Sequence, residues 1–325
     1  MFSMKPYYHM RFILGQSSIL VGGQAVMEGV MMRVPGAYAT AVRDSRGKIQ
    51  TNRREFKSIA ELYPLLKKPI LRGILGLFES LNIGYSTLQW SANVIADEEK
   101  NEISNKFVDV LLTVFSVSLA LALFFAAPIG LTSWLFDKDQ DAFIFNVISG
   151  IFRVVFFIVY LGLISLMKDV RRLFQYHGAE HKTVYNFESG LEMNVENAQS
   201  FPTQHPRCGT SFLFIIMIVA IFSFAVMDAL VIHYVGELIV WMRLVLHIPF
   251  IPVVAGIGYE VLKLTAKYRN NIFFRILAKP GIWLQNITTK QPNDDQVEVA
   301  LKALEEAFGN KMEKYKGKIY VAEAI

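Results

Sequence analysis

VDVLLTVFSVSLALALFFAAPIGLTSWL, residues 108–135, is an apolar run in which Asp109 is the one charged side chain. A helix needs about 20 apolar residues to cross the hydrocarbon core of a bilayer. Three further runs of this kind follow, at 143–167, 211–232 and 244–264. The composition agrees, with 53% hydrophobic residues, 19% charged residues and a mean hydropathy of +0.34. The sequence therefore predicts a mainly α-helical, polytopic membrane protein with about four transmembrane helices.

The connecting segments differ in charge, and this difference predicts their orientation. The link FDKDQD at 136–141 is acidic, and the link between the last two spans carries only Arg243 near its end. Basic residues concentrate instead in 168–210 (Lys168, Arg171, Arg172, Lys182 and Arg207) and after the fourth span (Lys263, Lys267, Arg269, Arg275 and Lys279). Positive loops stay in the cytoplasm, so we expect 168–210 and both termini there. The net charge of +5 predicts attraction to anionic membrane lipids. A nucleic-acid partner is not expected, since basic and aromatic residues do not interleave densely.

Three segments outside the spans are expected to form one cytoplasmic lobe. Residues 1–106 form the first segment. Within it, residues 36–54 alternate apolar and polar residues around DSRG, which predicts a β-hairpin, and 59–106 predicts a pair of amphipathic interfacial helices, with a re-entrant element as the alternative. The second segment is the motif-bearing loop 168–210 of the four-helix membrane domain, 107–265. The third is the helical C-terminal segment, 266–325, whose helix at 293–312 is predicted to be capped by Asp294 or Asp295 and to end at Gly309.

A histidine pair lies in YHGAEHKTVYNFESG, residues 176–190. His177 and His181 are four residues apart, so on a helix they share one face. With Glu180 they form H-x-x-E-H, the order in which inverted zinc peptidases place two metal ligands and a general base. A metal ion would lower the pKa of a bound water, and Glu180 would accept its proton. The motif therefore predicts a divalent metal ion, with zinc the best match.

The third ligand is open among three candidates. His205 and Cys208 follow in HPRCGTSF, residues 205–212, so three of the six histidines and the single cysteine lie between 177 and 208. Imidazole and thiolate are preferred zinc ligands. Glu260, near the end of the fourth span, is the third candidate. The alternative is a polar helix end at the membrane surface, with Thr210 or Ser211 capping the third span.

A second motif, VGGQAVMEGVMMRVPG, occupies residues 21–36. Its glycines and methionines give an adaptable backbone that other groups can approach closely. Glu28 and Arg33 could reach the metal or the substrate, and Arg33 could hold an anionic group. The alternative is a buried turn with a structural Glu–Arg pair.

GGQAVMEGVMMR, YHGAEHKTVYNFE and HPRCGTSF together closely resemble the YqhQ-like family of bacterial membrane proteins. The resemblance runs from about residue 20 to 310. It implies a bacterial inner-membrane protein and, because the family is described as a predicted metal-dependent enzyme, a bound metal. It implies no particular substrate.

These observations predict a metal-dependent hydrolase at the cytoplasmic face of the membrane, acting on a membrane-embedded peptide or a lipid-linked group. Two alternatives stay open. One is a membrane scaffold or assembly factor that a structural metal stabilises. The other is a transporter or channel, which the few polar residues within the spans disfavour.

Overall fold

The computed structural model describes residues 21–96, 106–136, 141–268 and 271–320. The acidic link at 136–141 and both termini therefore lie largely outside the described residues. Near the N-terminus the chain forms a four-stranded antiparallel sheet in the order β1-β2-β3-β4. The strands are β1 (Gly22–Val26), β2 (Gly29–Val34), β3 (Ala37–Arg43) and β4 (Ile49–Glu55).

The sheet consists of successive hairpins, and the sequence predicted one of them. The predicted hairpin is β3–β4, which turns at DSRG where Asp44 Oδ1 accepts the Lys48 backbone N–H at 2.8 Å and Gly47 has φ 79°. The β1–β2 hairpin was missed. Its turn is formed by Met27 and Glu28, and Glu28 adopts the left-handed φ of 51°. Gly29 is required there, because a Cβ at this position would lie 2.1 Å from the Ala41 carbonyl oxygen.

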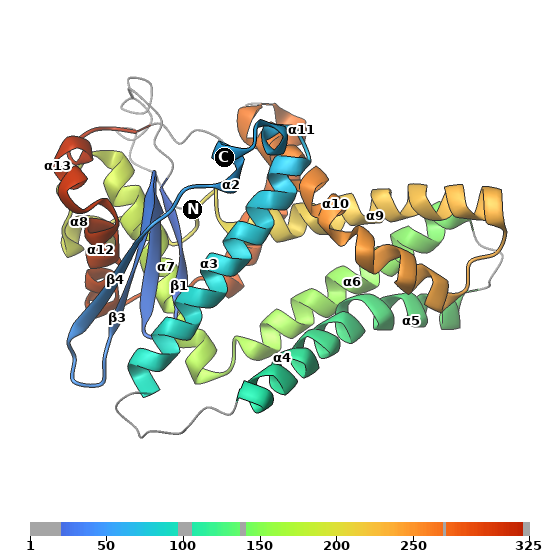
Figure 1. Ribbon diagram of the computed structural model, residues 1–325, viewed down its shortest axis with the longest axis horizontal. Helices are drawn as coiled ribbons and strands as arrows, with labels where there is room; N and C mark the ends of the chain where they lie inside the picture. Colours follow the sequence, from blue (N-terminus) through green and yellow to red (C-terminus); the bar gives the residue numbers. More distant parts are fainter. Residues whose placement is uncertain (1–20, 97–105, 137–140, 269–270, 321–325) are drawn as a thin grey trace.

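The rest of the described chain is mainly helical (Figure 1). The helices before the site motif are α2 (Ile59–Leu62), η1 (Pro64–Lys67), α3 (Leu71–Ala96), α4 (Lys106–Leu121), η2 (Ala122–Ala126), α5 (Ala127–Leu135) and α6 (Ala142–Ile164). Those that carry or follow it are α7 (Lys168–Ser189), α8 (Val195–Gln199), α9 (Gly209–Val235), α10 (Val240–Lys267), α11 (Ile272–Thr288), α12 (Asp294–Phe308), η3 (Gly309–Lys311) and α13 (Met312–Tyr315).

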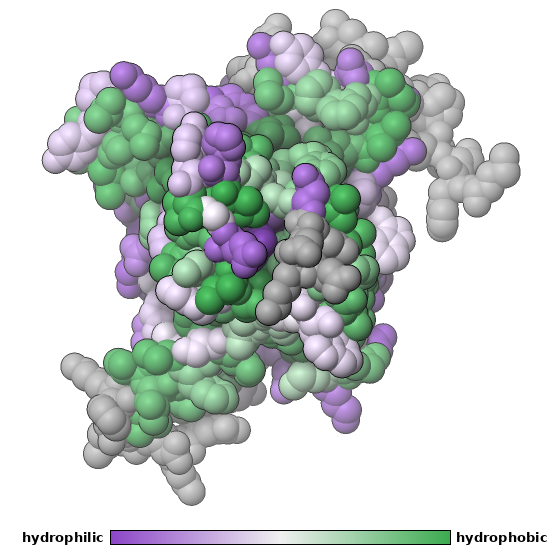
Figure 2. All heavy atoms as spheres, turned by 90° about the vertical axis from the view of Figure 1, so that its right-hand side faces the viewer, coloured by the Kyte–Doolittle hydropathy of each residue, from purple (hydrophilic) through white to green (hydrophobic). Residues whose placement is uncertain are grey.

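Four helical stretches are long and apolar enough to cross a membrane, as predicted. They are Val110–Leu135, Ala142–Ile164, Gly209–Val235 and Val240–Thr265. Figure 1 shows them extending to one side of the sheet. Much of the surface at their far end is hydrophobic (Figure 2). In the most apolar 18-residue window of the first stretch, the protein itself buries no residue, as expected for side chains that contact lipid.

One polar cluster lies among these apolar helices, and we call it the Asp228 cluster. Asp228, in α9, is fully buried and forms an ion pair with Arg243 of α10. Its carboxylate also accepts a hydrogen bond from Asn146 of α6 at 2.8 Å and lies 2.8 Å from Nε2 of His247. The Arg243 guanidinium stacks 3.8 Å from the centroid of the Phe145 ring. The cluster therefore joins three of the four candidate spans.

The three segments expected in one lobe share a single core. The sheet contributes Val30, Met32 and Ala39 to it, and α7 contributes Tyr176 and Phe187. From the C-terminal segment come Val297, Ala300, Ala303, Leu304 and Tyr320. Burial of this apolar surface holds α7 and α12 on the same side of the sheet.

The connection 168–210 contains the 22-residue helix α7, which carries His177 and His181 as their helical spacing predicted. Two local predictions need correction. Among the described residues 59–96, the predicted pair of helices is one long helix, α3, preceded by the short turns α2 and η1, and α3 buries Ile83 and Thr87. Asn293 caps α12, not Asp294 or Asp295, because Asn293 has the extended backbone that a cap requires and forms a reciprocal pair of hydrogen bonds with Gln296. Gly309 ends α12, as predicted.

Candidate metal centre

Helix α7 places His177 and His181 side by side. Their ring centroids are 4.5 Å apart, as the four-residue spacing predicts. Gly178, between them in the sequence, lets α7 contact the chain that leaves α11. A Cβ at Gly178 would lie 2.1 Å from the Lys290 carbonyl oxygen. The glycine of the motif therefore serves close packing.

Backbone carbonyls fix the tautomers of both histidines. Nδ1 of His177 lies 2.8 Å from the Thr288 carbonyl oxygen, and Nδ1 of His181 bonds the Thr203 carbonyl oxygen. A carbonyl oxygen can only accept a hydrogen bond, so each Nδ1 carries a proton. Each Nε2 of a neutral ring then keeps its lone pair, which is the arrangement found in metal-binding histidines. Burial also lowers the pKa of His181, which favours the neutral ring.

Cys208 completes a group of three candidate ligands. Its Sγ lies 3.2 Å from Nε2 of His177, and one ligand atom from each of His177, His181 and Cys208 lies within 4.8 Å of the others. Cys208 occupies the N-cap position of α9, so the alternative prediction that Thr210 or Ser211 caps this helix is wrong. Sγ lies 3.2 Å from Oγ1 of Thr210 instead. We call these three residues the His–Cys group.

Glu180 is buried beside the group. One carboxylate oxygen lies 3.4 Å from Nε2 of His181, and the Gly23 backbone N–H donates to the carboxylate. Burial raises the pKa of the Glu180 carboxyl, while His177, His205 and Arg207 oppose that rise. A raised pKa brings a carboxyl group closer to the range in which it exchanges protons near neutral pH.

Gly23 explains part of the glycine-rich motif. A Cβ there would lie 2.3 Å from the Met31 carbonyl oxygen and 3.0 Å from Cγ of Glu180. The absence of a side chain lets strand β1 approach Glu180 closely enough to donate its N–H.

His205 lies next to the His–Cys group without joining it. Its ring centroid is 5.6 Å from that of His181, and the Gln285 side chain bonds both its backbone N–H and its carbonyl oxygen. Burial lowers the pKa of His205 to about 4, so its ring is neutral at physiological pH.

Two residues next to the site, Glu188 and Arg207, were not predicted from the sequence. Glu188 and Arg207 form an ion pair, and the second oxygen of Glu188 lies 3.8 Å from Nε2 of His205. Glu188 follows His181 at helical spacing, seven residues on, which is the one signal that could have revealed it. Nε2 of His205 and Oε2 of Glu188 are buried without a hydrogen-bond partner among the described residues.

Three residues that were predicted for the site, Glu260, Glu28 and Arg33, contact other parts of the protein. Glu260 forms an ion pair with Arg72 of α3, away from the His–Cys group. Glu28 forms an ion pair with Arg172 and accepts a hydrogen bond from the Tyr176 hydroxyl at 3.3 Å.

Arg33 does not pair with Glu28, so the alternative prediction of a structural pair between these two residues is wrong. Its guanidinium lies 4.4 Å from the centroid of the Phe56 ring. The β1–β2 register explains the separation, because Glu28 occupies the turn and Arg33 lies opposite Gly22 at the far end of the hairpin.

The fold and the site together define a class of protein. It is a mainly helical protein with four helices that could span a membrane and a small four-stranded sheet near the N-terminus. Beside that sheet, two imidazoles and a thiol converge next to a buried carboxyl group.

The chain belongs to the family described as "Protein of unknown function (DUF1385)", whose model matches residues 68–310. It is similar to "Uncharacterized protein YqhQ" of Bacillus subtilis (strain 168), with 34% identity over 304 residues, which cover 88% of this chain and 91% of the relative. No solved structure matches.

Proposed function

We propose that this protein is a metal-dependent hydrolase in which His177, His181 and Cys208 hold a zinc-like divalent ion. The observation that carries the proposal is the pair of Nδ1–H bonds to the Thr288 and Thr203 carbonyl oxygens. These bonds leave both Nε2 lone pairs available near the Cys208 sulfur. Two nitrogens and one sulfur suit zinc, and three protein ligands with one open position are typical of catalytic zinc sites.

Glu180 is the proposed general base. A bound divalent ion would supply the acidity that turns a water molecule into a nucleophile near neutral pH. Glu180 lies beside His181 and is not itself one of the three ligands. Its carboxylate would take the proton from the water and return it to the leaving group. The Gly23 N–H would orient this carboxylate.

We also propose that the site lies at the cytoplasmic face of a bacterial inner membrane, with both termini in the cytoplasm. The four apolar helices and the basic residues of 168–210 support this. Cys208 directly precedes the candidate span α9, so a substrate at the membrane surface, either a peptide or a lipid-linked group, would be within reach. Membrane lipids would surround the four helices.

Metal analysis of the purified protein, combined with Glu180→Gln, tests the catalytic role. The variant should keep both the metal and the fold and should fail to restore function in cells that lack the wild-type protein. Gln has nearly the shape of Glu, so loss of packing cannot explain such a result. A wild-type protein without stoichiometric metal would refute the proposal.

A second candidate is a scaffold or assembly factor with a structural metal. Burial favours it, because His181 is 2% exposed, Glu180 5% and Cys208 7%. Structural zinc sites are typically closed in this way. In that case Glu180→Gln should fully restore function in cells that lack the wild-type protein, whereas His177→Ala should lose metal, fold and function together.

A further inference from the structure

Helix α11 has one buried face and one exposed face. The buried residues recur at the three- and four-residue spacing of a single helix face, namely Gly281, Leu284, Gln285 and Thr288. Four large apolar side chains of α11 are instead 55–65% exposed: Ile272, Phe273, Ile276 and Trp283. Ile272, Ile276 and Trp283 share the face opposite to the buried one, because their spacing is again helical. An exposed apolar stripe of this kind indicates a binding surface.

The buried face holds α11 at the start of a candidate span. A Cβ at Gly281 would lie 2.6 Å from Cα of Ser211, in the first turn of α9, and the Gln285 amide donates to Oγ of Ser211 at 3.3 Å. The candidate span Gly209–Val235 begins in that turn, and α11 follows soon after the candidate span Val240–Thr265 ends. Figure 1 shows α11 at the ends of α9 and α10 that are nearer to the sheet. The helix therefore lies at the level where these two spans would leave a membrane.

Two basic residues border the apolar stripe of α11. Arg275 and Lys279 are exposed and four residues apart, so they lie one turn apart on the same edge of the exposed face. The sequence of α11 contains no acidic residue, and neither side chain forms an ion pair with a residue that the structure describes. In α12, by contrast, Lys302 pairs with Glu305 and Glu306. The positive charges of α11 therefore face outward beside its apolar stripe.

We propose that the exposed face of α11 binds anionic lipids at the surface of the membrane. Helices with an apolar face and bordering basic residues lie in the plane of a membrane and bind most strongly where its lipids are anionic. The apolar stripe would contact the acyl chains, and Arg275 and Lys279 would contact the head groups. Trp283 would lie at the boundary between chains and head groups, where tryptophan is enriched. This proposal rests on the insertion of the four candidate spans into a membrane and does not depend on the metal.

The proposed lipid face and the candidate metal centre are the two sides of one helix. On the buried side, the Gln285 amide donates to the His205 carbonyl oxygen at 2.9 Å, and the Thr288 carbonyl oxygen lies 2.8 Å from Nδ1 of His177. An α-helix with its side chains is about 10–12 Å across. Lipid bound beside Trp283 would therefore lie about one helix diameter from the centre, within reach of the membrane-associated substrate proposed above.

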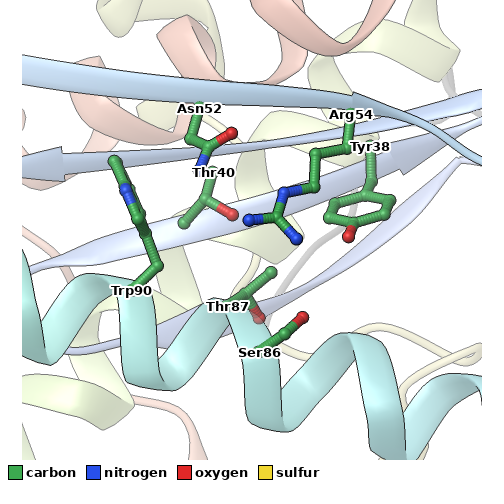
Figure 3. A pocket seen from close by; sticks show the side chains of 7 residues that line it. All are labelled: Tyr38, Thr40, Asn52, Arg54, Ser86, Thr87 and Trp90. Atoms are coloured by element: carbon green, nitrogen blue, oxygen red, sulfur yellow. The ribbon is translucent and has the colours of Figure 1, made fainter.

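The four tryptophans of the chain allow a direct test. Trp283 lies on the proposed lipid face. Trp134 and Trp241 are exposed at the far ends of the first and fourth candidate spans. Trp90 of α3 points toward the strands that carry Thr40 and Asn52 (Figure 3), so its ring is turned to the sheet. Four variants, each with three tryptophans replaced by phenylalanine, keep one tryptophan at a time.

Each variant of the full chain is reconstituted in nanodiscs whose acyl chains are brominated, because bromine quenches the fluorescence of a tryptophan that it contacts. Trp134, Trp241 and Trp283 should lose most of their fluorescence, and Trp90 should keep it. If Trp134 and Trp241 are not quenched, the spans are not inserted and the proposal fails with them. If these two are quenched and Trp283 is not, the spans are inserted but α11 does not contact lipid, and its exposed face belongs to a protein partner.

A second measurement tests the charge of the lipid. In nanodiscs of phosphatidylcholine with a small fraction of brominated lipid, brominated phosphatidylglycerol should quench Trp283 more strongly than brominated phosphatidylcholine. Arg275→Gln combined with Lys279→Gln should lower this preference about fivefold for each charge removed, because a basic residue near the surface contributes about that factor to the binding of anionic lipid.

The matched control is Lys302→Gln combined with Lys316→Gln. These changes remove the same charge from α12 and from the end of α13, which lie across the lobe from α11 (Figure 1). The preference of Trp283 for phosphatidylglycerol should then match that of the wild type. The proposal is overturned if the wild type shows no such preference, if the α11 pair keeps it, or if the control pair loses as much as the α11 pair.

Discussion

The Asp228 cluster and the His–Cys group are both buried and polar, but they differ in what their atoms leave unused. Asp228 has a cationic or polar partner on each carboxylate oxygen, from Arg243, Asn146 and His247. In the His–Cys group the outer nitrogens donate to carbonyl oxygens, and the inner ligand atoms face one another, where the single Cys208 thiol proton can serve only one imidazole nitrogen at a time. Apart from Nδ1 of His247, which is buried without a partner among the described residues, the Asp228 cluster satisfies its own charges and needs no ligand, whereas convergent lone pairs are the feature that indicates one.

The largest expected effect concerns the Asp228 cluster, in which the buried charges pair with one another. Asp228→Ala leaves Arg243 buried and unpaired, which should lower the free energy of unfolding by about 3–5 kcal/mol. Urea unfolding in detergent micelles measures the loss. The double change Asp228→Leu with Arg243→Met removes both charges and should cost less than Asp228→Ala alone. Equal stability of Asp228→Ala and the wild type would show that the cluster does not hold the helices together.

The next largest effect concerns the His–Cys group, in which the candidate ligand atoms face one another. His177→Ala removes one of three ligands and should weaken zinc binding more than about 100-fold, since loss of even an outer partner of a ligand costs about 10–100-fold. Equilibrium dialysis against zinc at neutral pH measures it. Glu260→Gln is the control: its carboxylate bonds Arg72, so zinc affinity should stay unchanged. A loss of zinc affinity in Glu260→Gln would show that Glu260 is a ligand after all.

A pH series tests the same comparison, because burial lowers the pKa of His205, next to the His–Cys group, and of His181 within it. The folded pKa of His205, about 4, lies below the ordinary 6.5. The unfolded chain therefore binds more protons between these values, and the free energy of unfolding falls as the pH falls through this window. The contribution of His205 is a loss of about 2 kcal/mol from pH 7 to pH 5.

Metal-free protein should show this loss in urea unfolding at the two pH values, and His205→Gln should reduce it by about that amount. Some loss should persist in the variant, because burial lowers the pKa of His181 as well. Identical pH dependence in both proteins would mean that His205 is not buried as described.

The smallest effect concerns Glu28. It is paired with Arg172, and the two side chains are 28% and 49% exposed. Solvent weakens such pairs, so Glu28→Gln should cost only about 0.2–1 kcal/mol of unfolding free energy. Zinc affinity should match that of the wild type. A large loss of zinc would place Glu28 in the metal site, against the contacts described above.

The four candidate spans and the β3–β4 hairpin could be predicted from the sequence because their signals are local. Apolar length marks each span, and alternation around DSRG marks the hairpin. The β1–β2 hairpin was missed because glycines and methionines obscure the alternation in VGGQAVMEGVMMRV. Its turn also uses a glutamate in a left-handed conformation, which the residue type does not favour.

Within the site, the His177–His181 pair followed from helical spacing alone. The sequence could not decide which of His205, Cys208 and Glu260 lies next to this pair. The answer depends on where α9 begins relative to α7 in the folded protein. The carbonyl groups of Thr203 and Thr288 carry no signal in the sequence, since every residue has one. Similarly, Glu260 had the expected position along the chain, but its partner Arg72 is 188 residues away.

The bond from His177 to the Thr288 carbonyl oxygen has a consequence for biosynthesis. Its two ends are separated by 111 residues, and the helices α9 and α10 are made in between. While the ribosome is still producing these helices, both histidines and Cys208 already exist, but the group that orients His177 does not. The complete centre can form only after residue 288 has left the ribosome and α11 has packed on α9. Loading of the proposed metal into the oriented centre would therefore be a late event, which follows synthesis of α9 and α10.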